Sequence, residues 1–215
     1  MIICDIGNTN VKFYEDGRFW KKSIDEFYDF KINERIYYIC VNKDIENYIS
    51  RNKNFINIEP YIEFDTIYSG LGIDRIAVCR AVRDGIVVDA GSAITVDIMS
   101  NGIHLGGYIL PGLQSYNRAY SSISPVLNKP INPNISLDML PQNTQDAISY
   151  AVLKSILLIL KDTSNNKRVY FTGGDGQYLS SFFDQSICEY DKALVFKGLE
   201  DIARKVSNSI IKKDV

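Results

Sequence analysis

The residues with the clearest chemical potential lie near the N-terminus, where a short apolar run ends in a carboxylate. The sequence there reads Cys4-Asp5-Ile6-Gly7-Asn8-Thr9-Asn10-Val11-Lys12. A strand that ends in Asp and turns through Gly places a carboxylate beside backbone N–H groups that can bind phosphate oxygens. Lys12 adds a cation, and the Mg²⁺ that accompanies a nucleoside triphosphate prefers oxygen ligands such as those of Asp5. The same residues are compatible with a plain hairpin turn, because Asp, Gly and Asn are common turn residues.

A second turn of the same kind opens the second half of the chain. Val88-Asp89-Ala90-Gly91-Ser92-Ala93 repeats the order of an apolar residue, Asp, a variable residue, Gly and a small residue. Each turn joins two apolar runs, which predicts an internal repeat. Two such turns resemble the arrangement in which proteins of the sugar-kinase and actin group bind ATP between two similar halves of the chain. The pair therefore favours nucleotide binding over two unrelated hairpins.

A third glycine-rich segment follows a β-branched and aromatic run. Phe171-Thr172-Gly173-Gly174-Asp175-Gly176 predicts a strand that turns through glycines into a helix. A turn without side chains lets a flat adenine ring approach the backbone closely. A strand-to-helix turn that needs positive φ explains the same residues, so this segment supports a nucleotide site only together with the two Asp turns.

The part of the site where phosphoryl transfer takes place is predicted at Gly70-Leu71-Gly72-Ile73-Asp74-Arg75, a flexible loop that enters a helix. Phosphoryl transfer to an alcohol needs a carboxylate within reach of the hydroxyl and positive charge on the transferred group. Asp74 and Arg75 can supply both. The alternative is that Asp74 only caps the helix. Capping would lower the pKa of Asp74, so that it would orient the hydroxyl and take the proton late.

These residues need strands and helices to position them. Hydrophobic patterning and turn signals predict strands at 1–4, 11–14, 18–22, 36–41 and 55–58, followed by 86–88, 94–99, 103–110 and 169–172. Helices are predicted near 44–51, 74–83, 144–161 and 199–211. Asp16-Gly17 and Asn101-Gly102 suit hairpin turns with positive φ. The stretch 121–141, with four of the six prolines, is predicted to be an ordered connector.

The predicted fold class is α/β, with two ribonuclease-H-like halves of the actin-like ATPase type, each a mixed five-stranded sheet with helices. We expect residues 1–85 to form a shortened N-terminal half and residues 86–215 to form the C-terminal half.

The composition narrows the function classes. The 24 Lys and Arg residues nearly balance the 26 Asp and Glu residues, and neither sign forms a block, so no nucleic-acid or membrane partner is expected. The four cysteines are widely separated, and the N-terminus carries no leader or long apolar stretch. We therefore expect a cytoplasmic protein. His104, the only histidine, is interpreted as a hairpin residue and rules out His-based triads and clusters.

The motifs taken together identify a family. In chain order they are Asp5-Ile6-Gly7-Asn8-Thr9, Gly72-Ile73-Asp74-Arg75, Asp89-Ala90-Gly91-Ser92-Ala93-Ile94-Thr95, Gly106-Gly107-Tyr108-Ile109-Leu110-Pro111-Gly112 and Thr172-Gly173-Gly174. The chain resembles a type III pantothenate kinase. The resemblance implies ATP-dependent phosphorylation of pantothenate to 4'-phosphopantothenate, the first step of coenzyme A biosynthesis.

The resemblance also implies a role for each motif residue. ATP would be bound by Asp5, Ile6, Gly7, Asn8, Thr9, Asn10, Val11, Lys12 and Ser92. Pantothenate would be bound by Tyr68, Gly72, Ile73, Asp74, Arg75 and Thr144, with Asp74 as the proton acceptor. Asp89 would bind a monovalent cation, K⁺ or NH₄⁺, and Mg²⁺ would arrive with ATP. A homodimer would complete the pantothenate pocket.

Several alternatives accompany these assignments. Thr144 is also a good helix N-cap, and Tyr68 could be a surface aromatic residue. Ser92 stands where the family usually has threonine, and the chain is short for the family. The family includes accessory factors for transcription, so a non-catalytic nucleotide-binding regulator is one alternative function. A kinase for another small hydroxyl or carboxylate acceptor, such as a sugar or acetate, is another.

Overall fold

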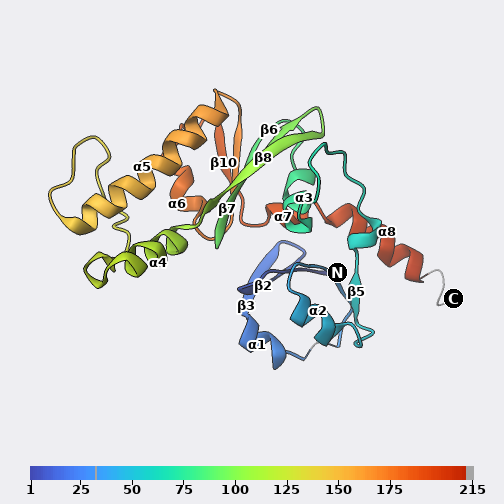
Figure 1. The fold of residues 1–215 in the computed structure, drawn as a ribbon. Helices are drawn as coiled ribbons and strands as arrows, with labels where there is room; N and C mark the ends of the chain where they lie inside the picture. Colours follow the sequence, from blue (N-terminus) through green and yellow to red (C-terminus); the bar gives the residue numbers. More distant parts are fainter. Residues whose placement is uncertain (32, 212–215) are drawn as a thin grey trace. The chain divides into compact units, whose positions relative to one another are not determined.

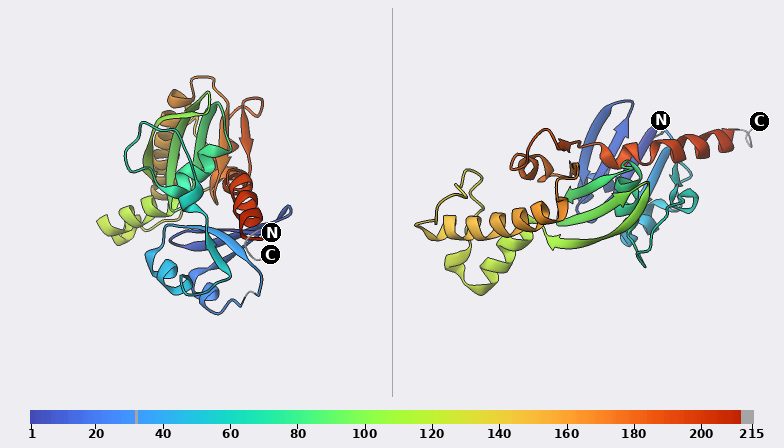
Figure 2. Two further views of the ribbon diagram at one scale, coloured as in Figure 1. Left: turned by 90° about the vertical axis from the view of Figure 1, so that its right-hand side faces the viewer. Right: turned by 90° about the horizontal axis from the view of Figure 1, so that it is seen from above.

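The computed structural model describes residues 1–31 and 33–211, and it divides into two compact units. Unit 1 contains Met1–Arg83, Met99–Gly106 and the described residues from Ala193 onward. Unit 2 contains Asp84–Ile98 and Gly107–Lys192. Figures 1 and 2 show the strands and helices of each unit.

Unit 1 is built on a mixed five-stranded sheet with the order β3-β2-β1-β4-β5. The strands are β1 (Ile2–Ile6), β2 (Asn10–Glu15), β3 (Arg18–Ser23), β4 (Ile36–Cys40) and β5 (Phe55–Asn57). The first three form an antiparallel meander, and β4 and β5 add in parallel next to β1. The Asp16-Gly17 hairpin turn has φ of 45° and 87°, which confirms the predicted positive values.

The two faces of the unit 1 sheet carry different helices. Helices α1 (Ile24–Tyr28) and α2 (Lys43–Ile49) bury Phe27, Ile45 and Ile49 against Ile2, Cys4 and Ile6 of β1. Successive side chains of a strand point to opposite faces, so Ile3 and Asp5 face the other side. Helix α3 (Ile73–Arg80) packs against β4, and α7 (Leu194–Lys197) packs against β1.

Unit 2 has a five-stranded sheet with the order β10-β9-β6-β7-β8. The strands are β6 (Gly85–Ala90), β7 (Ala93–Ser100), β8 (Ile103–Pro111), β9 (Val169–Thr172) and β10 (Cys188–Tyr190), and the hairpin end of β7 and β8 belongs to unit 1. The long helix α5 (Thr144–Ser164) covers one face of this sheet, with Val152, Leu153 and Ile156 in the core beside β6 (Figure 2).

The remaining elements are two helices of moderate length and three short elements. They are η1 (Glu59–Tyr61), α4 (Leu113–Ile123), η2 (Pro125–Leu127), α6 (Gly176–Ser180) and α8 (Glu200–Ile211). Among the described residues, no helix combines the length and the apolar character that a membrane span requires.

The predicted fold class is confirmed, and most predicted elements occur within a few residues of their predicted ends. The prediction for 121–141 was wrong at its start, because α4 extends to Ile123, and η2 follows at Pro125–Leu127. The patterning also missed the 11-residue helix α4 and the short elements α1, α7 and β10.

Candidate active site

The turn after β1 places Asp5 against Lys12. Lys12 Nζ donates to Asp5 Oδ2 at 3.0 Å, and the Asp5 side chain is only 6% exposed. The two residues face each other across the β1–β2 ladder, so the hairpin itself sets this pair. The Gly7 N–H donates to the Asn10 carbonyl at 3.0 Å and closes the turn. The turn thus offers a buried carboxylate and a half-buried cation side by side.

The other predicted ATP-binding residues of this turn fall into two groups. Ile6 and Val11 are fully buried in the core of unit 1, so only their backbone can reach a phosphate. Asn8 and Thr9 carry polar side chains, and both residues are exposed. The predicted phosphate contacts of Ile6 and Val11 thus depend on backbone atoms, whereas those of Asn8 and Thr9 can use side chains.

Asp74 occupies the first turn of α3, but it does not cap the helix. The N-cap residue is Gly72, which makes no side-chain capping bond. Asp74 Oδ1 accepts the Arg75 N–H at 2.9 Å. Burial raises the pKa of Asp74 above its ordinary value, and the nearby negative charge of Asp5 also raises this pKa. The alternative, a capping residue with a lowered pKa, was wrong, because desolvation outweighs the backbone hydrogen bonds.

Arg75 is almost fully buried, at 5% exposure. Its guanidinium carbon lies 4.9 Å from the centroid of the Tyr68 ring, within the range of a cation–π contact. Tyr68 itself is 37% exposed, so one end of the pair remains open to a ligand. Asp5, Lys12, Tyr68, Asp74 and Arg75 thus all lie in unit 1, and Asp5 is close enough to Asp74 to raise its pKa.

The second Asp turn lies in unit 2, where it packs against the third glycine-rich segment. The Asp175 N–H donates to the Ala90 carbonyl at 2.9 Å. Gly173 has φ of +85°, and a Cβ atom there would overlap the Ala90 carbonyl oxygen and lie 2.5 Å from Asp89 Oδ1. The turn at Asp89 and the Thr172-Gly173-Gly174 segment thus form one continuous structure.

Ser92 is exposed at this turn. Its carbonyl accepts the Gly112 N–H at 3.2 Å and the Ser115 hydroxyl at 3.0 Å. These bonds tie the turn to the end of the Gly-Gly-x-Ile-x-Pro-Gly segment and to the start of α4. Sequence reasoning missed the role of Ser115, because only the fold brings it next to Ser92.

Thr144 lies apart from these turns, at the start of α5. The N-cap is Asn143, whose side chain accepts the Asp146 N–H at 2.9 Å, so the alternative interpretation of Thr144 as a helix N-cap was wrong. Thr144 is exposed instead. It lines an open hollow of about 600 Å³ together with Tyr120, Leu127, Pro141, Gln142, Asn143, Ala147 and Ile148.

The sheets, the crossovers and the paired Asp turns define a protein of the actin-like ATPase fold. The solved structure of apo pSK41 ParM has a TM-score of 0.51 with 10% identity, and it covers 97% of this chain and 98% of its own. This likeness supports the fold alone.

The family follows from closer relatives. A model described as type III pantothenate kinase matches residues 57–163. A type III pantothenate kinase from Campylobacter jejuni is 53% identical over 97% of this chain and 99% of its own length. One from Helicobacter hepaticus is 50% identical over 95% and 99%. The chain belongs to the type III pantothenate kinase family, and its length matches that of these relatives.

A solved structure from Campylobacter jejuni, described as a conserved Baf family transcriptional activator, is also very similar. It has a TM-score of 0.88 with 52% identity, and the match covers 97% of this chain and all of the other.

Proposed function

We propose that this protein transfers the γ-phosphoryl group of ATP to the primary hydroxyl of pantothenate, which gives 4'-phosphopantothenate and ADP for coenzyme A biosynthesis. The observation that carries the proposal is the position of Asp74, a half-buried carboxylate with a raised pKa at the start of α3, next to buried Arg75. Use of ATP further suggests that the protein acts in the cytoplasm, which cell fractionation tests.

Asp74 is the proposed proton acceptor. A carboxylate accepts a proton more readily as its pKa rises toward the working pH, so burial makes Asp74 a better base than an exposed aspartate. Its negative charge also orients the acceptor hydroxyl. Arg75 supplies fixed positive charge next to it, which suits the phosphoryl group or the pantothenate carboxylate. Tyr68, Gly72, Ile73 and Thr144 are proposed as further pantothenate contacts.

The ATP phosphates are proposed to bind at the turn from Asp5 to Lys12, with Ser92 as an additional contact. Asp5 would hold the Mg²⁺ that arrives with ATP, because a buried carboxylate provides the oxygen ligands that this ion prefers. Bound Mg²⁺ supplies charge neutralisation on the phosphates. Lys12 then holds Asp5 in place and adds a second positive charge.

Asp89 is the proposed ligand of K⁺ or NH₄⁺. The Asp89 carboxylate and the Ala90 carbonyl both face the position of Gly173, so the local donor set consists of oxygen atoms. One carboxylate with carbonyl oxygens suits a weakly held monovalent cation. We also propose that residues 1–85 and 86–215 are the repeated halves, supported by the matching turns at Asp5 and Asp89.

Release of ADP tests this function. We expect ADP release to require pantothenate and to be faster in KCl or NH₄Cl than in NaCl at equal ionic strength. Acetate and simple sugars serve as competing acceptors. Release with one of them but not with pantothenate would favour a different kinase. The similarity to a structure described as a transcriptional activator makes a regulator the second candidate, and nucleotide binding without any acceptor-dependent turnover would favour it.

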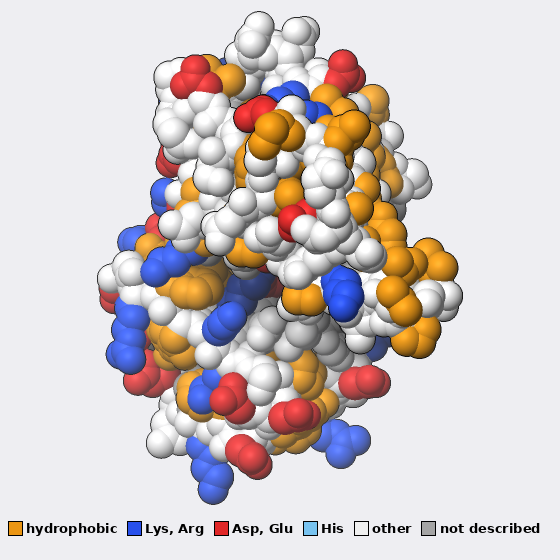
Figure 3. Space-filling view, turned by 90° about the vertical axis from the view of Figure 1, so that its left-hand side faces the viewer, with side chains coloured by type: hydrophobic (Ala, Val, Ile, Leu, Met, Phe, Trp, Pro, Cys, Tyr) orange, Lys and Arg blue, Asp and Glu red, His pale blue; other side chains and the backbone are white. Residues whose placement is uncertain are grey.

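A homodimer is proposed from an apolar surface on unit 2. Its exposed side chains are Ile123, Val126, Met139, Leu140, Leu158 and Ile159, and four of them are more than 65% exposed. Figure 3 shows hydrophobic side chains gathered on the face that α4 and α5 present. An uncovered apolar surface of this kind is typical of an interface. The hollow beside Thr144 lies among the same elements, so a partner could complete it.

The variant Leu158→Glu tests the dimer. Leu158 is 59% exposed on α5, and a charge there would be buried without a partner in a dimer. We expect the dimer to dissociate about 100-fold more readily, measured by sedimentation velocity over a range of concentrations. Ile211→Glu, at a residue 53% exposed on α8, is the matched control and should leave the dimer intact. A wild-type protein that stays monomeric at every concentration would refute the proposal.

A further inference from the structure

His104 is fully buried in unit 1, although it is polar and lies outside the motifs described above. It sits on β8, where it forms an isolated parallel bridge with Thr66, and its backbone N–H donates to the Asp65 carbonyl at 3.0 Å. Its ring atom Nδ1 lies 2.7 Å from Thr66 Oγ1, which is a short hydrogen bond. Because a buried polar ring is costly without such a bond, His104 and Thr66 are held together firmly.

The Thr66 hydroxyl also holds the backbone of Tyr68. The Tyr68 N–H donates to Thr66 Oγ1 at 3.0 Å. A hydroxyl has one hydrogen and two lone pairs, so Thr66 can serve the imidazole and this N–H at once. The ring centroids of Tyr68 and His104 lie 6.1 Å apart at an angle of 58°. Tyr68 is thus fixed to His104 both by its backbone and by its ring.

The same chain of contacts reaches Arg75. The Arg75 guanidinium lies over the Tyr68 ring at 4.9 Å, and Arg75 directly follows Asp74 in α3. A change in the conformation of Tyr68 would therefore remove the support under the guanidinium. Tyr68 connects the buried histidine to the charged end of the acceptor site.

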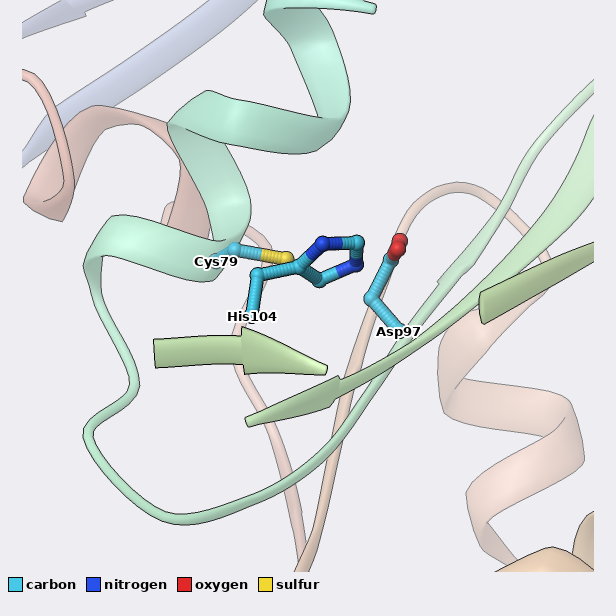
Figure 4. A group of neighbouring side chains, drawn as sticks. All are labelled: Cys79, Asp97 and His104. Carbon is cyan, nitrogen blue, oxygen red and sulfur yellow. The ribbon is translucent and has the colours of Figure 1, made fainter. Parts of the chain in front are cut away.

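The imidazole also lies close to α3. The Cys79 sulfur and a ring nitrogen of His104 lie within 4.8 Å of each other. Figure 4 shows the Cys79 side chain pointing from α3 toward the imidazole. Asp97, the third residue labelled there, lies on the part of β7 that belongs to unit 2. Within unit 1, His104 thus bonds to the segment that carries Tyr68 and lies close to the helix that carries Asp74 and Arg75.

We propose that His104 and Thr66 form a positioning pair that sets Tyr68, and through it Arg75, for binding of the acceptor. The pair touches no reacting atom. This inference rests on the proposed function, in which Tyr68 and Arg75 contact pantothenate.

The variant Thr66→Val tests the pair, because it keeps the shape of the side chain and removes the hydroxyl. We expect the KM for pantothenate to rise on the order of 10-fold, while kcat and the KM for ATP stay within about twofold of wild type. Thr66→Ser restores a hydroxyl and should restore the KM. Thr163→Val is the matched control, since Thr163 makes an equally short 2.7 Å contact with the Tyr108 hydroxyl in unit 2. It should leave the KM for pantothenate unchanged.

A double-mutant cycle separates positioning from general damage. In a Tyr68→Ala background, Thr66→Val should change kcat/KM for pantothenate by less than about twofold, because the Tyr68 ring through which Thr66 acts is already absent. Full additivity of the two changes would overturn the proposal. So would a Thr66→Val variant in which kcat falls and the KM values for pantothenate and for ATP both rise. If the wild-type protein does not turn over pantothenate, the proposed function is wrong, and this inference falls with it.

Discussion

Replacement of Asp74 by Asn is expected to lower kcat/KM for pantothenate by a factor of about 10² to 10⁴, the usual range for loss of a general base. The amide is nearly isosteric with the carboxylate and can still accept the Arg75 N–H at 2.9 Å, so the start of α3 should keep its structure. It cannot take a proton from the acceptor hydroxyl. Initial rates of ADP release at saturating ATP measure the effect.

The same variant should be at least as stable as wild type at neutral pH. Burial raises the pKa of Asp74, so the native state binds this proton more tightly than the unfolded chain does. The contribution of Asp74 to stability therefore falls as the pH rises from its ordinary pKa through the raised one. Asn carries no charge, so the stability of the variant relative to wild type should grow across this window. Thermal unfolding at a series of pH values measures the difference.

Asp25→Asn is the matched control for Asp74→Asn. Asp25 holds the equivalent position in the first turn of α1, but it is exposed. We expect unchanged turnover and a loss of about 0.3 to 1 kcal/mol, because an exposed carboxylate favours the positive end of a helix. Wild-type turnover in Asp74→Asn would exclude Asp74 as the base. A large loss of stability in the same variant would indicate that the carboxylate is structural.

The second large effect is expected for Gly173→Ala. Gly173 has φ of +85°, which alanine adopts only with strain, and its Cβ would collide with the Ala90 carbonyl and the Asp89 carboxylate. The strain and the overpacking together should cost about 2 to 4 kcal/mol. The collision also displaces the proposed cation ligands, so we expect a higher K⁺ concentration for half-maximal rate. Thermal unfolding and K⁺ titrations measure the two effects.

Gly17→Ala separates backbone strain from collision. Gly17 has nearly the same φ, +87°, but a Cβ there meets no atom within 4 Å. It should cost only about 1 kcal/mol and leave the K⁺ dependence unchanged. Equal losses of stability in the two variants, with no change in the K⁺ response, would contradict the structure of the Asp89 turn described above.

Local patterns were sufficient for most of the fold. The runs that became β1, β4 and β6 are continuous apolar segments that end at an Asp, a Gly or a polar residue, and Asp16-Gly17 and Asn101-Gly102 formed the expected turns. The missed strand β10 has only three residues, one of them an exposed Glu189, so it shows no hydrophobic pattern. It forms because β9 offers a parallel edge to pair with.

The candidate site could be predicted only in its local parts. The Asp turns and the loop before α3 carry recognisable residue orders within a few positions. The pKa of Asp74 depends on burial and on Asp5, which is distant in sequence, so its direction could not be read from the helix start alone. Likewise, the contact between Thr66 and His104 joins residues 38 positions apart, and no sequence period connects them.

The identity of the phosphorylated product tests the central claim most directly. Wild-type protein, ATP, Mg²⁺, K⁺ and pantothenate should yield a phosphate monoester on the primary hydroxyl of pantothenate, detected by ³¹P NMR and mass spectrometry. Asp74→Asn at equal concentration should form this product at least about 100-fold more slowly. Release of ADP without this phosphate ester, or equal product formation by the variant, would contradict a pantothenate kinase that uses Asp74 as its base.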